Sequence, residues 1–132
     1  MTTTYDVEDL IDYDFDEENS LLRAKYTHDQ PQIDAGQAKA IIDLRRQVTR
    51  HLPHRLLMFA TSLDGFTSEA QAVLFGPDGM DGITSIALLY TPSTQPIAEA
   101  IEKSPDNKIP VKAFPANEIA AAEEWLLQQA IA

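Results

Sequence analysis

Two short, almost uninterrupted apolar runs constrain the fold more than any other feature of this sequence. The first is LLMFA at residues 56–60, and the second is ITSIALLY at residues 83–90. Such runs are too short to form independent helices and are typical of central strands covered on both faces. Between them lies a segment that Thr67 or Ser68 can cap and that continues as a short helix to about Phe75. The runs therefore predict parallel strands joined by a β-α-β crossover.

The segment before these runs alternates strictly and predicts an antiparallel hairpin. Residues 11–16 place apolar side chains on one side and aspartates on the other, and a second strand at 21–26 follows a turn at 17–20. We expect Leu22 on the apolar side and Leu21, Arg23 and Lys25 on the exposed side. The expected cross-strand pairs are Asp12 with Lys25, Tyr13 with Ala24, Asp14 with Arg23, and Phe15 with Leu22.

The remaining segments complete an alternation of strands and helices. Asp34 and Gln37 form a capping-box pattern that opens a helix to about Arg50. A helix after Thr91 and Ser93 ends before Pro105, a final strand occupies 109–114, and a last helix starts near Asn117. The predicted order is β-β-α-β-α-β-α-β-α, an α/β mixed sheet in a single domain spanning residues 1–132. Residues 1–10 are polar and acidic, and we expect them to be frayed.

Charge and composition exclude several classes of partner. The chain has 21 acidic and 10 basic residues, a formal charge of -11 that phosphate backbones repel, so we expect no nucleic-acid partner. There is no cysteine, which fits a reducing compartment, and we expect a cytoplasmic protein. No apolar stretch approaches the ~20 residues of a membrane span, and we expect no membrane insertion.

The sequence contains no common signature of catalysis or cofactor binding. It lacks GxGxxG, the Walker lysine loop, HExxH, GxSxG and CxxC, so we expect no enzyme, no cofactor and no metal. The aspartates at 12, 14 and 16 imitate the start of a calcium loop, but Glu17 replaces the glycine at its sixth position. Arg23 replaces the glutamate at its twelfth position, and strand pairing explains the aspartates better.

The basic residues are concentrated around the motif HLPH. We expect most of them to complement the negative end of the preceding helix dipole. The alternative is a docking patch for an acidic protein or an anionic headgroup. The residues concerned are Arg45, Arg46, Arg50, His51, His54 and Arg55.

Thr67 and Ser68 are the hydroxyl residues with the strongest functional interpretation. Ser68 with Gln71 matches a capping box, so a purely structural role accounts for them. The alternative is that Ser68 is a phosphorylation switch at a helix start, where added negative charge would change affinity for a partner.

Four motifs occur in order along the chain: DFDEENSLLRAKY, LLMFA running into LDGFTSEA, the second apolar run followed by TPSTQPIAEAI, and NKIPVKAF before a helix with AEEWL. In these motifs and their order the sequence resembles the SpoIIAA-like superfamily of STAS and SEC14-like small bacterial domains, in its uncharacterised branch. The resemblance covers nearly the whole chain from about Tyr13. It implies a mixed sheet with helices and a binding or regulatory role.

The resemblance also bears on Ser68. In anti-sigma-factor antagonists of this superfamily an aspartate–serine pair with a nearby glycine carries the phosphorylated serine. Aligning that pattern places Thr67 on the aspartate, Ser68 on the serine and Ala70 on the glycine, so the serine is kept and both neighbours are lost.

Two functional hypotheses follow. The first is a regulatory module that recognises an unknown protein partner, and that can form a homodimer, with its binding surface at Asp64, Phe66, Thr67 and Ser68. The second is a carrier or sensor of a small apolar, lipid-like ligand, with a pocket around the glycine-rich loop. The expected pocket residues, beside Phe66, are Leu63, Phe75, Met80 and Ile83.

Overall fold

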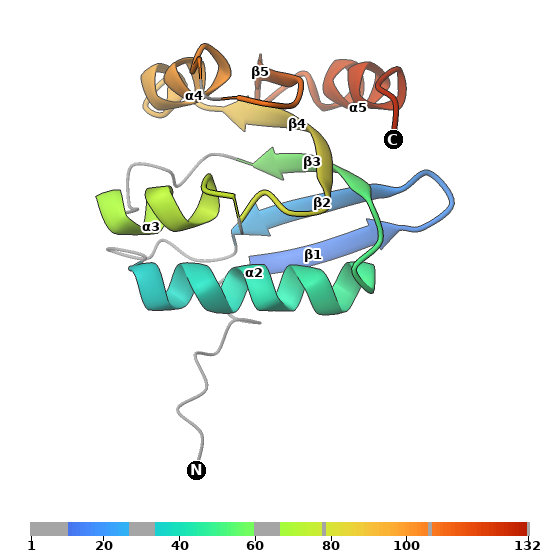
Figure 1. Ribbon diagram of the computed structural model, residues 1–132. Coiled ribbons are helices and arrows are strands. Elements are labelled where there is room, and N and C mark those ends of the chain that lie inside the picture. The colour runs from blue at the N-terminus through green and yellow to red at the C-terminus, as the bar shows by residue number, and fades with distance from the viewer. Residues whose placement is uncertain (1–10, 27–33, 60–66, 78, 106, 132) are drawn as a thin grey trace.

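The computed structural model describes residues 11–26, 34–59, 67–77, 79–105 and 107–131 (Figure 1). The predicted frayed segment 1–10 lies outside these residues. The described elements follow the predicted order of strands and helices. They are β1 (Ile11–Asp16), β2 (Leu21–Tyr26), α2 (Ala35–Thr49), β3 (His54–Phe59), α3 (Ser68–Leu74), β4 (Ile83–Tyr90), α4 (Gln95–Glu102), β5 (Val111–Pro115) and α5 (Ile119–Leu127).

The strands form one mixed sheet in the order β1-β2-β3-β4-β5. β1 and β2 are antiparallel, and the pairs Asp14–Arg23 and Tyr13–Ala24 have the predicted register. The neighbours β2–β3, β3–β4 and β4–β5 are all parallel. This confirms the predicted α/β class with an antiparallel hairpin at one edge.

Helices cover both faces of the sheet unequally (Figure 1). One face packs against α2, α3 and α4 through a core that includes Ile41, Ala70 and Ala98. The other face packs against α5 through a smaller core that includes Leu57 and Leu126. The two apolar strands β3 and β4 contribute alternate side chains to both cores, which explains why their sequences have no polar face.

One side-chain assignment in the hairpin is wrong. Leu21 was expected on the exposed side with Arg23 and Lys25, but it is only 1% exposed and belongs to the core under α5. Arg23 on the same side donates hydrogen bonds from Nε and Nη2 to the carboxylate of Glu123 in α5, at 3.0 and 2.9 Å. Because α5 covers this face, the charged side of the hairpin is partly enclosed.

Local capping explains where two of the helices begin. Asp34 accepts a hydrogen bond from the Gln37 backbone, and the Gln37 side chain accepts one from the Asp34 backbone, as the capping box predicts. At α3 the cap is Thr67, whose Oγ1 accepts from the Ala70 amide at 3.0 Å. Ser68 is therefore the first residue of the helix, and the capping box of Ser68 with Gln71 is wrong.

Some element boundaries differ from the prediction. β3 begins at His54, two residues earlier than expected, and β5 occupies Val111–Pro115. Within the described part of the chain, no helix is long and apolar enough to cross a bilayer.

Candidate functional site

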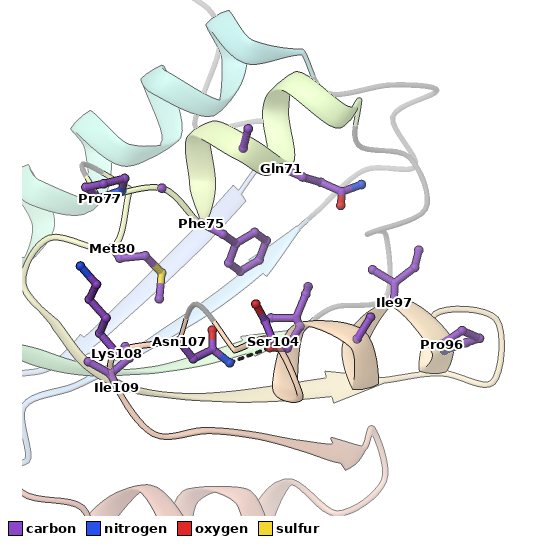
Figure 2. Close-up of a pocket in the computed structure, with 14 residues that line it drawn as sticks. Gln71, Phe75, Pro77, Met80, Pro96, Ile97, Ser104, Asn107, Lys108 and Ile109 are labelled. Carbon is purple, nitrogen blue, oxygen red and sulfur yellow. Dashed lines mark hydrogen bonds between the residues drawn. The ribbon is translucent and has the colours of Figure 1, made fainter.

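A groove separates α3 from α4 on the three-helix face of the sheet (Figure 2). Its volume is about 980 Å³. Most of the side chains that form it are apolar and come from α3, the loop after it, α4 and the segment before β5. The described lining residues are Gln71, Ala72, Phe75, Gly76, Pro77, Met80, Pro96, Ile97, Ala100, Ile101, Ser104, Asn107, Lys108 and Ile109.

Phe75 and Met80 lie between the groove and the core. Both line the groove, and both also line a small internal void of about 30 Å³ beside Tyr13 and Ile86. Figure 2 shows the Phe75 ring directed from the end of α3 toward α4. These two side chains therefore present one surface to a molecule in the groove and the other to the packed interior.

The wall formed by the loop after α3 is held from below by a buried arginine of α2. Arg45 is 4% exposed, and its guanidinium donates to the carbonyl of Gly79 at 2.5 Å and to that of Asp81 at 2.7 Å. The Met80 amide donates to the Gly76 carbonyl at 3.0 Å. Hydrogen bonds to a charged donor are stronger than neutral ones, so Gly79 and Asp81, on either side of Met80, are held in place from the α2 side of the loop.

Two glycines are required by the path of this loop. A Cβ at Gly79 would lie 2.2 Å from the Val73 carbonyl oxygen and 2.4 Å from that of Leu74, far inside contact distance. Gly82 has φ = +83°, a conformation that side chains disfavour. The glycine-rich loop is thus explained by close backbone packing against α3 and by one left-handed residue.

A buried imidazole lies where this loop joins the sheet. His54 is 1% exposed, and its Nδ1 donates to the Leu52 carbonyl at 2.8 Å. Burial lowers the pKa of His54, and the Arg45 charge lowers it further. The neutral imidazole packs edge-on against Phe15 at 6.4 Å between ring centroids. This histidine is part of the core and is remote from solvent.

A smaller hollow of about 350 Å³ lies on the other side of α3, toward α2. Its lining includes three charged side chains, Lys39, Asp43 and Arg46, beside apolar ones, whereas the larger groove is lined mainly by apolar side chains. Arg46 lies 3.9 Å from the carboxylates of both Asp43 and Asp81.

The structure describes some of the residues predicted to bind a partner or a ligand, and others lie outside the described ranges. Asp64, Phe66 and Leu63 lie outside the described residues. The Thr67 hydroxyl caps α3 by accepting a hydrogen bond from the Ala70 amide, whereas Ser68 is exposed at the start of the helix.

Of the expected pocket residues that the structure describes, Phe75 and Met80 line the groove. Ile83 is 6% exposed and lies in the core, where it borders the small void.

The sequence did not predict the wall of the groove that α4 and the segment before β5 form. Ile97 and Ile101 have the spacing of a core-facing helix surface, and nothing local distinguishes a groove wall from a core contact. Asn107 and Lys108 follow α4 and begin the motif NKIPVKAF, which predicted a strand and gave no indication of a groove. The glycine-rich loop identified one wall, but the opposite wall depends on how far apart α3 and α4 lie.

The basic residues around HLPH do not form one surface. Arg45 and His54 are buried, so the alternative of a docking patch that includes them is wrong. Arg55 donates from Nε and Nη2 to the Gln129 carbonyl at 3.1 and 2.8 Å, and Arg50 pairs with Glu17. Arg46 lies in the last turn of α2, where the expected interaction with the helix dipole applies.

The calcium-like aspartates are engaged in local contacts. Asp14 pairs with Arg23 at 3.3 Å, and Asp16 accepts from the Asn19 side chain at 2.7 Å. That hydrogen bond lowers the pKa of Asp16. Among the residues that the structure describes, no group of three or more potential metal ligands is clustered.

A match to a protein-family model covers both sides of the groove. Residues 15–130 match the family described as Domain of unknown function (DUF7793). No curated protein and no solved structure matches the chain. Since the match spans most of the sequence, including α3, the glycine-rich loop and α4, the chain belongs to the DUF7793 family.

Proposed function

We propose that this domain is a non-enzymatic binding module that takes up a small apolar molecule in the groove between α3 and α4. The observation that supports the proposal is a groove of about 980 Å³ lined mainly by apolar side chains. Sites for small molecules have volumes of about 300–1,000 Å³ and the same kind of lining, with a few polar groups. The resemblance to the SpoIIAA-like superfamily agrees with a binding role, and the lack of cysteine favours the cytoplasm as its location.

The construction of the groove also supports binding. The loop that forms one wall is held by buried hydrogen bonds from Arg45 to Gly79 and Asp81. A wall that is already fixed costs little ordering entropy when a ligand enters. The apolar side chains at the groove would lose contact with water on binding, which supplies the driving force.

A neutral fluorophore tests this proposal. Phenylnaphthylamine fluoresces strongly in apolar sites and carries no charge that could report on electrostatics. Ala100 is exposed on α4 and lines the groove, so Ala100→Phe would fill the space with little effect on the core. We expect this variant to bind the fluorophore about tenfold more weakly than the wild type, a loss of about 1.4 kcal/mol.

The matched control is Ala121→Phe, at an exposed position of α5 on the opposite face of the sheet. It adds the same side chain away from the groove and should bind as the wild type does. Equal binding by Ala100→Phe and Ala121→Phe would contradict the proposal, as would no binding by the wild type.

A second candidate function is recognition of a protein partner through the start of α3. The observation in its favour is that Ser68 and Glu69 are exposed, because the capping role belongs to Thr67. Ser68→Asp, which imitates added negative charge, should change the recovery of a partner from host lysate relative to Ser68→Ala. Equal recovery with both variants would count against this surface.

Self-association is a part of this second candidate. β1 and β5 are the outer strands of the sheet, and outer strands can pair with another copy. Light scattering at two protein concentrations would reveal a dimer, and a monomer at both would exclude it at those concentrations.

A further inference from the structure

The charge on the groove is opposite to that of the molecule as a whole. The chain has a formal charge of -11, yet the one charged side chain among the described groove-lining residues is Lys108. Within the described part of the chain, its ammonium has no ion pair with a carboxylate. Lys108 is exposed and therefore accessible to a ligand as well as to water.

Lys108 lies at one end of the groove. Figure 2 shows its side chain beside Met80 and below Pro77, whereas Ile97 and Pro96 lie at the opposite end. The groove therefore has a cationic end and an uncharged end, where the Gln71 side chain lies together with Ile97 and Pro96. An elongated molecule with a charged head and an apolar body would match both in only one orientation.

The backbone that carries Lys108 is fixed to the end of α4. The Asn107 side chain donates from Nδ2 to the carbonyls of Ile101 and Glu102, at 2.7 and 3.2 Å. The Asn107 amide donates to the Ser104 carbonyl at 3.3 Å. These contacts satisfy carbonyls at the end of the helix and hold the residue before Lys108 in place.

From this arrangement we infer that the ligand of the groove is an anionic amphiphile, with its apolar chain between α3 and α4 and its anionic head at Lys108. The head is a carboxylate or a phosphate, since both accept hydrogen bonds from an ammonium. This inference rests on the proposed function, because it requires that the groove bind an apolar molecule at all.

The test displaces bound phenylnaphthylamine with ligands that share one chain and differ in the head. Dodecanoate and dodecyl phosphate are anionic, dodecanol is neutral, and dodecyltrimethylammonium is cationic; each is used below its micelle concentration. We expect the two anions to bind the wild type about threefold to fivefold more tightly than dodecanol, the range of an exposed charge pair. The cation should bind more weakly than dodecanol.

Three variants isolate the role of Lys108. Lys108→Gln should remove the preference for the anions while it preserves the affinity for dodecanol, and Lys108→Arg should retain the preference. The matched control is Lys103→Gln, which removes an exposed lysine that does not line the groove and should retain the preference. A preference that increases at low salt would agree with the same cause.

The outcomes separate this inference from the function on which it rests. If dodecanol and dodecanoate bind equally, the ligand's head is not anionic; if Lys103→Gln loses as much preference as Lys108→Gln, the head does not lie at Lys108. In both cases the proposal of an apolar groove is unaffected. If the wild type binds neither phenylnaphthylamine nor any of the dodecyl ligands, both are wrong. Tighter binding of dodecanoate than of dodecyl phosphate would assign the head as a carboxylate, and the reverse as a phosphate.

Discussion

The two sides of α3 differ in how they meet their neighbours. Toward α2, the helix and the loop after it are fixed by Arg45 and by contacts in the main core, and a smaller hollow of about 350 Å³ with charged and apolar lining remains. Toward α4, apolar side chains from both helices line a groove of about 980 Å³. The same seven-residue helix is thus more closely packed on its α2 side than on its α4 side.

This difference shows that the groove is not a consequence of loose packing around α3. The loop after the helix is held by a buried charged donor and by a glycine that allows close backbone contact. A poorly packed region would show neither feature. The open side is therefore a property of where α4 lies, above β4 and β5, relative to a well-fixed neighbour.

The largest expected effect on stability comes from truncating an isoleucine of α2, compared with an isoleucine of α4 that lines the groove. Ile41 of α2 is 2% exposed, so Ile41→Ala should lower the free energy of unfolding by about 3–4 kcal/mol. Ile97 of α4 lines the groove and is half-buried, so Ile97→Ala should cost only about 1 kcal/mol. Urea unfolding of the two variants measures both values. Equal losses would mean that the groove is closed in solution.

The next effect tests the clamp under the loop after α3, that is, the hydrogen bonds from Arg45 to the carbonyls of Gly79 and Asp81. Arg45→Met removes the donor to the Gly79 and Asp81 carbonyls and should lower the free energy of unfolding by about 3 kcal/mol. The adjacent Arg46 is partly exposed and forms ion pairs with Asp43 and Asp81 at 3.9 Å, so Arg46→Met should cost less, about 1 kcal/mol. Chemical denaturation compares the two.

A binding measurement sharpens the same test. If Arg45 fixes the groove wall, Arg45→Met should also weaken binding of phenylnaphthylamine under conditions where the variant remains folded, and Arg46→Met should not. Equal stability of the two variants would show that the loop does not depend on the clamp.

Much of the fold could be predicted because its local signals agree with one another. The hairpin register followed from alternation and a four-residue turn, and the two apolar runs identified the central strands. Leu21 was misplaced because alternation describes one covered face, whereas α5 covers the second face from a hundred residues further along the chain. The burial of Arg45 likewise depends on a loop that is distant in sequence.

The candidate site was predicted in part for the same reason. Phe75 and Met80 adjoin a loop with recognisable glycines, so local sequence drew attention to them. Ile97 and Lys108 join them only through the placement of α4 against β5, and an amphipathic helix gives the same pattern whether its apolar side meets a core or a groove.

The smallest expected effect concerns pH and the packed side of the molecule. Burial lowers the pKa of His54 below its ordinary 6.5, so the folded protein binds fewer protons than the unfolded chain as pH falls below that value. The contribution of His54 to stability is therefore fully present above about pH 6.5. It decreases below that pH, by at most about 1.4 kcal/mol per pH unit, until the folded pKa is reached.

His54→Asn retains a donor for the Leu52 carbonyl but does not titrate, so its urea midpoint should fall less between pH 7 and pH 5 than that of the wild type. His51→Asn, at an exposed position with φ = 61° that asparagine tolerates, is the matched control and should follow the wild type. If His54→Asn shows the same pH dependence as the wild type, the imidazole is not held neutral in the core, and the packed side of the molecule is more open to water than its burial indicates.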